Sequence, residues 1–509
     1  MEGGANRAAR APTDAWFAIG VTLLFTLVCG FTIVHHEMWR DELQAWLLAR
    51  DSDSVAQLLQ RIRYEGHPAI WYLLLFALTR VTHRPEAMQL LHLVIAASCT
   101  FLSARAAPFP RWVRLFVCLG YFLLYEYGVI ARNYSLGIFF VFAAAALFPR
   151  RRERPWLLGA MLVLAAHTIV HVLFIAAAVA AALFVEVVLS RERRADLVAA
   201  AKTLSVTAIG ILVAAIRLRP PADSGFYETW VTQWNRARAE HVLGLFAQAL
   251  LPIPGGRGVW GELWLETVSR HVAPALSLLF GAVLLVYFRR RRVGLMAFAV
   301  GSAALLAFFY TKYDGSIRHH GFLFINLLVA LWLAEGAASE AGTGAADAGR
   351  SASPSRGSLF GWLVASVLIV QLVAGAIAVR QDVTLVFSAG RATAALLVAK
   401  GLDSLPLVGD VDTAMSPILG YLDARSIYYL RGQRFGSFVV LDQARRGTVT
   451  DEQVFAAADA LSRERQSAVG IILNRQASAS AVGKAEEVGC VAADVTTFES
   501  YCVYRLDSH

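Results

Sequence analysis

Long apolar runs, separated by short charged segments, occupy the first 380 residues of the chain. Each run is about 16 to 22 residues long, which is the length that an α-helix needs to cross the hydrocarbon core of a membrane. The run after Arg7 and Arg10 has no small-residue cleavage site, so we expect a retained helix rather than a removable signal sequence. We predict crossing helices at about 16–34, 86–104, 112–128, 134–148, 156–170, 172–189, 200–217, 271–288, 293–310, 320–335 and 358–379.

A shorter apolar segment at 68–82 decides the topology. With about 15 residues, it favours a re-entrant or interfacial segment over a crossing. If it does not cross, the arginine-rich loops all lie on the same side as the N-terminus, as the positive-inside rule requires. Those loops are 105–114, 150–155, 190–194 and 289–292. The pattern therefore predicts a mainly α, polytopic membrane bundle of about eleven transmembrane helices.

This topology also assigns the segments between the helices to one side of the membrane or the other. The long segment 35–85, the segment 218–270 and the short segment 311–319 fall on the outer side. The segment 218–270 contains several tryptophans, which is typical of an interfacial stretch. Residues 336–357 are rich in Ala, Gly and Ser and predict a flexible cytoplasmic linker.

Beyond residue 380 the pattern becomes that of a soluble α/β domain. We therefore predict a transmembrane domain over 1–380 and a soluble domain over 381–509 on the outer side. Cys490 and Cys502 share the second domain, where a disulfide can form if the compartment is oxidising. The expected strands are Leu405–Val408, Ser437–Leu441, Val469–Leu473 and Tyr501–Tyr504, and the expected helices are 413–422 and 451–463.

Composition supports the membrane assignment. Of the 509 residues, 57% are hydrophobic and only 17% are charged, whereas a soluble protein has roughly a quarter of its residues charged. The mean hydropathy is +0.53. The net charge of +9 comes with arginines clustered in short loops, so it indicates a lipid bilayer as partner and not a nucleic acid.

The first candidate site residues follow directly after the first apolar run. Asp41 and Glu42 lie side by side near Arg40 and two histidines. Neighbouring residues of a helix point about 100° apart, so only one of the two carboxylates can face a given pocket. A solvated loop at the membrane interface would also explain these residues. Further along, Glu65 and His67 precede the re-entrant segment, where a simple turn is the alternative.

Cationic residues recur in the other outer segments, against the positive-inside bias, and this favours a bound anion. Arg132 lies next to Tyr134 in one junction, and a second group consists of Lys312, Arg318, His319 and His320. His167 and His171 have the spacing of one helix face, for which a metal pair, helix–helix contacts and donor contacts are all possible.

Carboxylates from one segment and cations from others suit transfer from a lipid phosphate. A phosphate leaving group needs charge neutralisation, and an acceptor hydroxyl or amine needs a general base, which a carboxylate can supply. The sequence has no Gly-rich phosphate loop, Walker pattern or zinc-protease motif, so a nucleotide-sugar donor is unsupported.

The ordered set of Asp-Glu, His-Pro and Ala-Arg-x-Tyr resembles the membrane-embedded GT-C glycosyltransferases. Within them it is similar to the protein O-mannosyltransferases and the aminoarabinose transferases of lipid A, a group like glycosyltransferase family 39. The resemblance covers about 16–335 and is strongest over 35–175. One departure is Ala69, where the family usually has a second proline. The resemblance implies a GT-C fold, a polyprenyl-phosphate-linked sugar donor, inversion at the anomeric carbon and chemistry on the outer face of a bacterial inner membrane.

By position, the resemblance implies that Asp41 is the general base and that Glu42 is a supporting carboxylate. Glu65 and His67 would line the sugar pocket. The donor-phosphate ligands would be Arg132 and Tyr134 with the cations near Arg318, namely Lys312, Arg318, His319 and His320. His171 is a further candidate for substrate binding. The resemblance gives neither the acceptor nor a firm cofactor, although some members use a divalent cation. A lipid or sugar-lipid transporter and a non-catalytic scaffold are the alternatives, but the repeated halves expected of a transporter are not evident.

Overall fold

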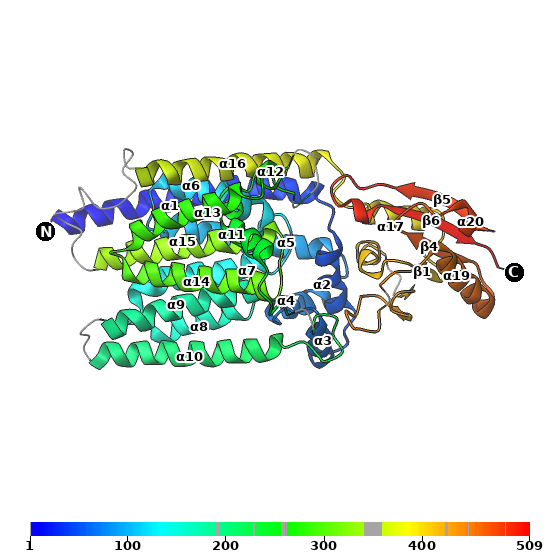
Figure 1. Cartoon of the computed structure of the whole chain (residues 1–509), viewed down its shortest axis with the longest axis horizontal. Coiled ribbons are helices and arrows are strands. Elements are labelled where there is room, and N and C mark those ends of the chain that lie inside the picture. Colours follow the sequence, from blue (N-terminus) through cyan, green and yellow to red (C-terminus); the bar gives the residue numbers. More distant parts are fainter. Residues whose placement is uncertain are drawn as a thin grey trace.

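The computed structural model describes residues 2–189, 194–227, 230–255, 260, 262–340, 359–422, 426–445, 447–483 and 485–508. A bundle of long helices occupies most of the molecule, and a small sheet domain formed by the C-terminal residues lies at one end of it (Figure 1). The N-terminus lies at the opposite end of the bundle. The predicted fold class, mainly helical with a C-terminal α/β domain, is confirmed at this level.

Seven described helices are long and apolar enough to cross a membrane, judged by length and composition. They lie within α1 (Glu2–His35), α5 (Glu86–Ala106), α9 (Val170–Leu189), α10 (Arg194–Leu218), α14 (Arg292–Thr311), α15 (Ile317–Glu340) and α16 (Leu359–Thr384). Shorter apolar helices add to the bundle, namely α7 (Tyr134–Leu147), α8 (Pro155–Ala166) and α13 (Val272–Phe288). The count of about eleven crossings stays a prediction.

The outer faces of the bundle are suited to lipid. On α1, Leu27 is 70% exposed and Val34 is 74% exposed, and α10, α13 and α16 present similar apolar side chains. Exposing such side chains to water costs about 25 cal/mol per Å² of apolar surface, a cost that a bilayer removes. By contrast, α15 is buried along most of its length and forms the centre of the bundle. The described helices are therefore those of an integral membrane protein.

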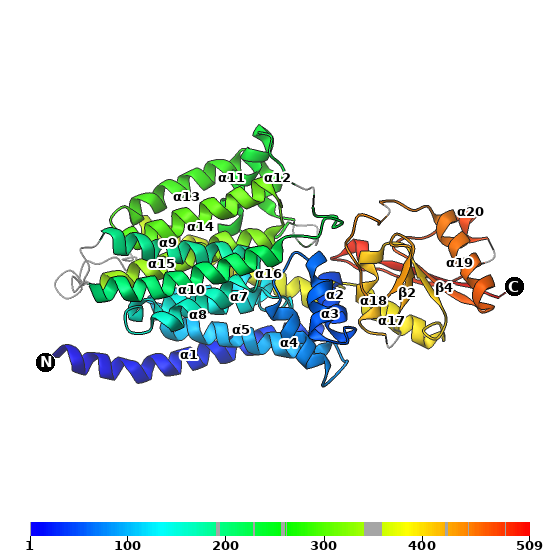
Figure 2. The ribbon, with the colours of Figure 1, turned by 90° about the horizontal axis from the view of Figure 1, so that it is seen from below.

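Three short helices lie between the bundle and the sheet domain, as both views show (Figures 1 and 2). They are α2 (Arg40–Arg50), α3 (Val55–Arg61) and α4 (Ile70–Thr79). The segment 68–82, expected to be re-entrant, contains α4. Its ten residues rise about 15 Å, roughly half of the hydrocarbon core.

The bundle differs from the predicted layout in two places. The segment 218–270, expected to be a loop, contains the helix α11 (Arg236–Leu250), whose second half is buried in the bundle. The single crossing expected at 112–128 is instead α6 (Arg111–Leu119) followed by a π-helix at Tyr121–Glu126. The backbone is extended at Gly120 between them, where α16 packs so closely that a Cβ on Gly120 would lie 3.2 Å from Gln371.

Arginine-rich loops gather at the end of the bundle away from the sheet domain. Arg291 pairs with Glu335 near the far end of α15, and Arg151 pairs with Glu186 near the far end of α9. The cluster at 190–194 lies largely outside the described residues. Of the predicted linker 336–357, the first residues continue α15 to Glu340, and the remainder also lies outside the described residues.

The sheet domain contains six strands in the order β3-β2-β1-β4-β6-β5. Strand β1 pairs in parallel with β2 and β4, while the other pairs are antiparallel. The predicted strand at Ser437–Leu441 is wrong, because this stretch has no strand in the structure. The strands are β1 (Leu407–Gly409), β2 (Ile427–Tyr429), β3 (Arg434–Gly436), β4 (Val469–Leu473), β5 (Glu486–Val491) and β6 (Tyr501–Leu506).

Helices cover this sheet, and a disulfide crosses its edge. The helices are α17 (Gly390–Ala399), α18 (Ser416–Leu419), α19 (Asp451–Arg465) and α20 (Ala479–Val482). The helix predicted at 451–463 matches α19, whereas the one predicted at 413–422 is only a short 3₁₀ turn followed by α18. Cys490 and Cys502, which are paired across β5 and β6, are bonded to each other.

Candidate active site

Asp41 and Arg318 form the centre of a charged cluster between the bundle and the sheet domain. Asp41 is in the first turn of α2, and Arg318 is in the first turn of α15. An Nη atom of Arg318 lies 3.2 Å from a carboxylate oxygen of Asp41. The Asp41 side chain remains 29% exposed, whereas that of Arg318 is only 13% exposed. The carboxylate can therefore still be reached by another molecule.

Arg132 joins the cluster from the junction before α7. Its guanidinium donates to the main-chain oxygen of Asp41 and, at 3.1 Å, to Nε2 of His67. It also lies over the ring of Tyr134, 5.9 Å from the ring centre. The predicted residues Asp41, His67, Arg132, Tyr134 and Arg318 are therefore brought together from four distant parts of the chain.

The charges in this cluster set its protonation states. Burial alone would raise the pKa of Asp41, but the charges of Arg318 and Arg132 outweigh this effect and hold the pKa below its ordinary value. Burial and Arg132 together lower the pKa of His67 to about 3. A neutral His67 agrees with the geometry, because its Nε2 accepts a hydrogen bond from a guanidinium that can only donate. The guanidinium of Arg40 also lies 3.7 Å from a carboxylate oxygen of Asp41. At neutral pH the cluster therefore contains one carboxylate and three guanidinium cations.

Aromatic rings hold Arg318 in place. Its guanidinium lies 4.7 Å from the ring centre of Trp39 and 5.0 Å from that of Trp260. The two indoles meet edge to face with their centres 4.7 Å apart. Cation–π contacts of this kind stabilise a desolvated guanidinium and leave its N–H groups free to bind an anion. The Nε atom of Arg318 has no hydrogen-bond partner among the described residues.

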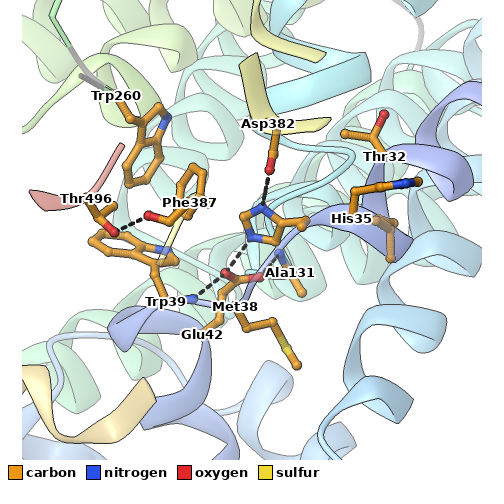
Figure 3. Close-up of polar contacts among 12 residues, drawn as sticks. Thr32, His35, Met38, Trp39, Glu42, Ala131, Trp260, Asp382, Phe387 and Thr496 are labelled. Atoms are coloured by element: carbon orange, nitrogen blue, oxygen red, sulfur yellow. Dashed lines mark hydrogen bonds and ion pairs between the residues drawn. The ribbon is translucent and has the colours of Figure 1, made fainter. Parts of the chain in front are cut away.

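Glu42 points about 100° away from Asp41 around α2 and is completely buried. One carboxylate oxygen accepts the main-chain N–H of Ala131 at 2.6 Å, and the other accepts that of Trp39 at 3.2 Å (Figure 3). Ala131 is the neighbour of Arg132, just as Glu42 is the neighbour of Asp41. The buried carboxylate therefore fixes the distance between the segments that carry Asp41 and Arg132.

His36 connects Glu42 to the last long helix. The His36 ring lies 3.0 Å from Glu42 through Nε2 and 3.0 Å from Asp382 of α16 through Nδ1. Burial would lower the pKa of His36, but the charges of Asp382 and Glu42 raise it to about 10. The imidazole is thus a cation between two carboxylates, and it joins α1, α2 and α16.

This raised pKa predicts a loss of stability at high pH. The folded-state pKa of His36 is about 10, above the ordinary value of about 6.5, so its stabilising contribution is complete below pH 6.5 and is lost as the pH rises toward 10. We expect the thermal unfolding midpoint in detergent to fall between pH 7 and pH 10. A His36→Gln variant should unfold earlier and show a weaker dependence on pH. Equal slopes for both proteins would contradict the prediction, and His83→Gln, which changes an exposed histidine, is the control.

Glu65 lies beside the cluster and contacts α2. Gln44 donates to its carboxylate at 2.9 Å and also to the main-chain oxygen of Val439 in the sheet domain. Burial raises the pKa of Glu65 to about 7, although the Gln44 hydrogen bond acts in the opposite direction. Gln44 thus links the sheet domain to Glu65, which lies beside the cluster around Asp41.

The remaining predicted residues divide into two groups. His171 and His319 lie together below the cluster, with ring centres 5.1 Å apart, and the His319 ring meets that of Tyr134 edge to face. His320 and Lys312 point elsewhere. His320 contacts the main-chain oxygen of Asp314 at 2.8 Å, and Lys312 donates to that of Phe226 at 2.6 Å.

The expectation that His167 and His171 share a helix face is wrong. His167 ends α8 and contacts the main-chain oxygen of Gly210, whereas His171 is in the first turn of α9. A turn lies between the two helices, so the spacing of four residues does not put the two histidines on one helix face.

The His, Cys, Asp and Glu side chains of the described residues do not support metal binding. No three or more His, Cys, Asp and Glu side chains in the described part of the chain are grouped to hold a metal ion. At Asp41 the guanidinium groups of Arg318 and Arg40 already pair with the carboxylate, and their charge opposes a divalent cation. The site therefore does not fit a metal, and the divalent cation stays an expectation of the resemblance.

Several residues of the site could not be found from the sequence. Trp39, Trp260 and Gln44 each contact a predicted site residue but belong to no recognisable pattern. Asp382 supports the site indirectly, through His36. Glu126 is another, since it is buried and accepts hydrogen bonds from Tyr121 and Trp260. The only signals were that Glu126 is a carboxylate inside the apolar run predicted at 112–128 and that Trp260 falls in the tryptophan-containing outer segment 218–270.

Comparison with known proteins gives few matches. No family model and no curated protein matches the chain. Among solved structures, the cryo-EM structure of the arabinofuranosyltransferase AftD from Mycobacteria is similar, with a TM-score of 0.40 and 14% sequence identity. The match covers 97% of this chain and 40% of that chain. The chain therefore spans about two-fifths of the length of the protein that it matches.

Proposed function

We propose that this chain is a membrane glycosyltransferase that moves a monosaccharide from a polyprenyl-phosphate donor to an acceptor on the outer face of the membrane. The observation that carries the proposal is the accessible carboxylate of Asp41, which pairs with the guanidinium of Arg318 while the guanidinium of Arg132 binds the main-chain oxygen of the same residue. A general base beside two cations matches what a phosphate leaving group and a hydroxyl or amine acceptor need.

In the proposed reaction the acceptor oxygen or nitrogen attacks the anomeric carbon of the donor sugar. Asp41 takes the proton of the acceptor, while the bond between the anomeric carbon and the phosphate oxygen breaks. The electron pair of that bond leaves with the polyprenyl phosphate, and Arg132 and Arg318 stabilise its charge. Attack from the face opposite the phosphate inverts the anomeric carbon. His67 and Glu65 are placed to contact the sugar.

The arginines couple donor binding to the basicity of Asp41. In the free protein their charges lower the pKa of Asp41, which makes it a weak base. A donor phosphate that binds Arg318 and Arg132 would neutralise much of that charge. The basicity of Asp41 would then rise only when the donor is present, so that an acceptor is not activated without one.

The outer location rests on the sheet domain. This domain contains the Cys490–Cys502 disulfide, and disulfides persist mainly in oxidising compartments outside the cytoplasm. The arginine-rich loops lie at the opposite end of the bundle, as expected for cytoplasmic loops. Both features support an outer location for the candidate site, where a lipid-linked donor and not a nucleotide sugar would be available.

An Arg132→Ala variant tests the proposed phosphate contact. We expect the ratio kcat/KM for the donor to fall by about 100-fold or more, because hydrogen bonds and charge that stabilise a transition state are worth about 3–4 kcal/mol. Initial rates with purified protein over a range of donor concentrations measure this. Arg63→Ala, which removes an exposed arginine of the same outer segment, should keep the wild-type value. Near-normal turnover in Arg132→Ala would remove Arg132 from its role.

The activity itself is tested by incubating the purified protein with a panel of radiolabelled polyprenyl-phosphate sugars. Transfer to an acceptor, or slow hydrolysis of one donor, is the expected result and would identify the sugar. Movement of a labelled lipid across a vesicle membrane without hydrolysis or transfer of any donor would instead indicate a transporter and overturn the proposal.

A further inference from the structure

A cavity lies at the other end of α2 from Asp41. Its volume is about 640 Å³, within the usual range for ligand pockets. Its walls come from the end of α2 at Arg50, the loop between α4 and α5, and the sheet-domain segment Gly420–Leu422. The cavity is therefore formed where the bundle and the sheet domain meet, and the proposed reaction does not use it.

The cavity is placed at the membrane surface. Its wall ends at Glu86, the first residue of the candidate crossing helix α5. Beside it, Val81 is 84% exposed and Leu90, one turn into α5, is 64% exposed. Large apolar side chains exposed at this level are suited to lipid chains. The mouth of the cavity thus adjoins the region where lipid headgroups lie.

Cations dominate the wall of the cavity. Arg80 donates to the main-chain oxygen of Arg50 at 2.8 Å and has no carboxylate partner among the described residues. Arg84 is exposed, and its guanidinium makes no ion pair or hydrogen bond in the described part of the chain. The carboxylate of Glu86 is already paired with Arg391 at 3.1 Å, and Arg50 pairs with Asp51 at 2.8 Å. Two arginines therefore remain available to an anion.

We propose that this cavity binds the phosphate of an anionic lipid headgroup. Guanidinium groups match phosphate oxygens with paired hydrogen bonds, and Arg80 is already fixed by its contact with the chain. The exposed apolar residues beside the cavity would contact the lipid chains. A lipid bound here would touch the α4–α5 loop, α2 and the sheet domain together. The site does not depend on the proposed transfer reaction.

Lipid retention by the full chain tests this site without any turnover assay. The protein is purified in a mild detergent, mixed with equal amounts of phosphatidylglycerol and phosphatidylcholine, and examined by native mass spectrometry. We expect the wild type to retain phosphatidylglycerol preferentially. Each cation near a lipid headgroup strengthens anionic-lipid binding by about fivefold, so Arg84→Gln should lower retention about fivefold and Arg84→Glu should lower it further. The matched charge reversal Arg63→Glu, also at an exposed arginine of the outer segment, should have no effect.

Competition with inorganic phosphate distinguishes a site for free phosphate from a site for a whole lipid. Displacement of phosphatidylglycerol by millimolar inorganic phosphate would show that the headgroup phosphate is sufficient, and resistance would show that the lipid chains contribute. Both outcomes support a phosphate site. Equal retention of the two lipids by the wild type, or unchanged retention in both Arg84 variants, would overturn it. The Arg84 side chain has no hydrogen bond or ion pair to lose among the residues that the structure describes, so both variants should fold, which their elution volumes and thermal midpoints would show.

Discussion

An Asp41→Asn variant should lose transfer by about 100-fold to 10,000-fold, because general-base catalysis is worth that much. The change removes the proton acceptor but keeps the shape of the side chain next to Arg318. It also removes a negative charge beside the two arginines, so the donor should bind as tightly as before or more tightly. A fall in kcat with an unchanged or lower KM for the donor is therefore the expected result, measured by initial rates at varied donor concentration.

The control for this variant is Asp53→Asn, which makes the same change at an exposed position of the same outer segment. It should have wild-type rates. If Asp41→Asn raised the KM and kept kcat, Asp41 would be a binding group and not the base. Wild-type kcat and KM in this variant would remove Asp41 from the site altogether.

A Glu42→Ala variant should destabilise the fold by about 3–5 kcal/mol, the range found when one partner of a buried ion pair is removed. The substitution leaves the main-chain N–H groups of Trp39 and Ala131 without their acceptor. It also leaves His36 with only one of its two carboxylates. The thermal midpoint in detergent should fall clearly, and the remaining folded protein should transfer slowly because Asp41 and Arg132 lose their common support.

Glu153→Gln is a suitable comparison, since Glu153 is exposed at the far end of the bundle, where such changes stay within about 0.5 kcal/mol. Asp382→Ala should repeat the instability of Glu42→Ala, because it breaks the same buried network from α16. A Glu42→Ala protein with wild-type stability would show that this network does not support the site.

Much of the bundle could be predicted from the sequence, because a crossing helix must be long, apolar and bounded by charges. The exceptions have physical causes. Helix α11 begins with Arg236, Arg238 and Glu240, and its 15 residues carry too many charges to stand out from a loop. The break at Gly120 depends on the close approach of α16, a contact between distant segments. Likewise β2 and β3 have three residues each, too few for an alternating pattern.

The site was predictable where the sequence signal was local. Arg132 and Arg318 stood out as cations against the positive-inside bias, while Asp41 and His67 stood out in the Asp-Glu and His-Pro motifs. The structure brings these four residues together. Lys312 and His320 gave the same signal but bind main-chain oxygens nearby. Asp382 gave none, because it lies 346 residues from His36 and looks like an ordinary helix end. A cation in an outer segment indicates that it has a polar partner. Only the folded structure shows whether that partner is a bound ligand or a main-chain oxygen of the protein.

The contacts of α2 also bear on how the protein matures. This helix leaves the ribosome well before its partners Val439 and Glu499, which follow Gln44 and Arg40 by 395 and 459 residues. Translation must therefore proceed through Glu499 before Asp41 and the arginines around it can reach their final positions. Under the proposed function, a product truncated before Glu499 would lack these supports and should not consume the donor.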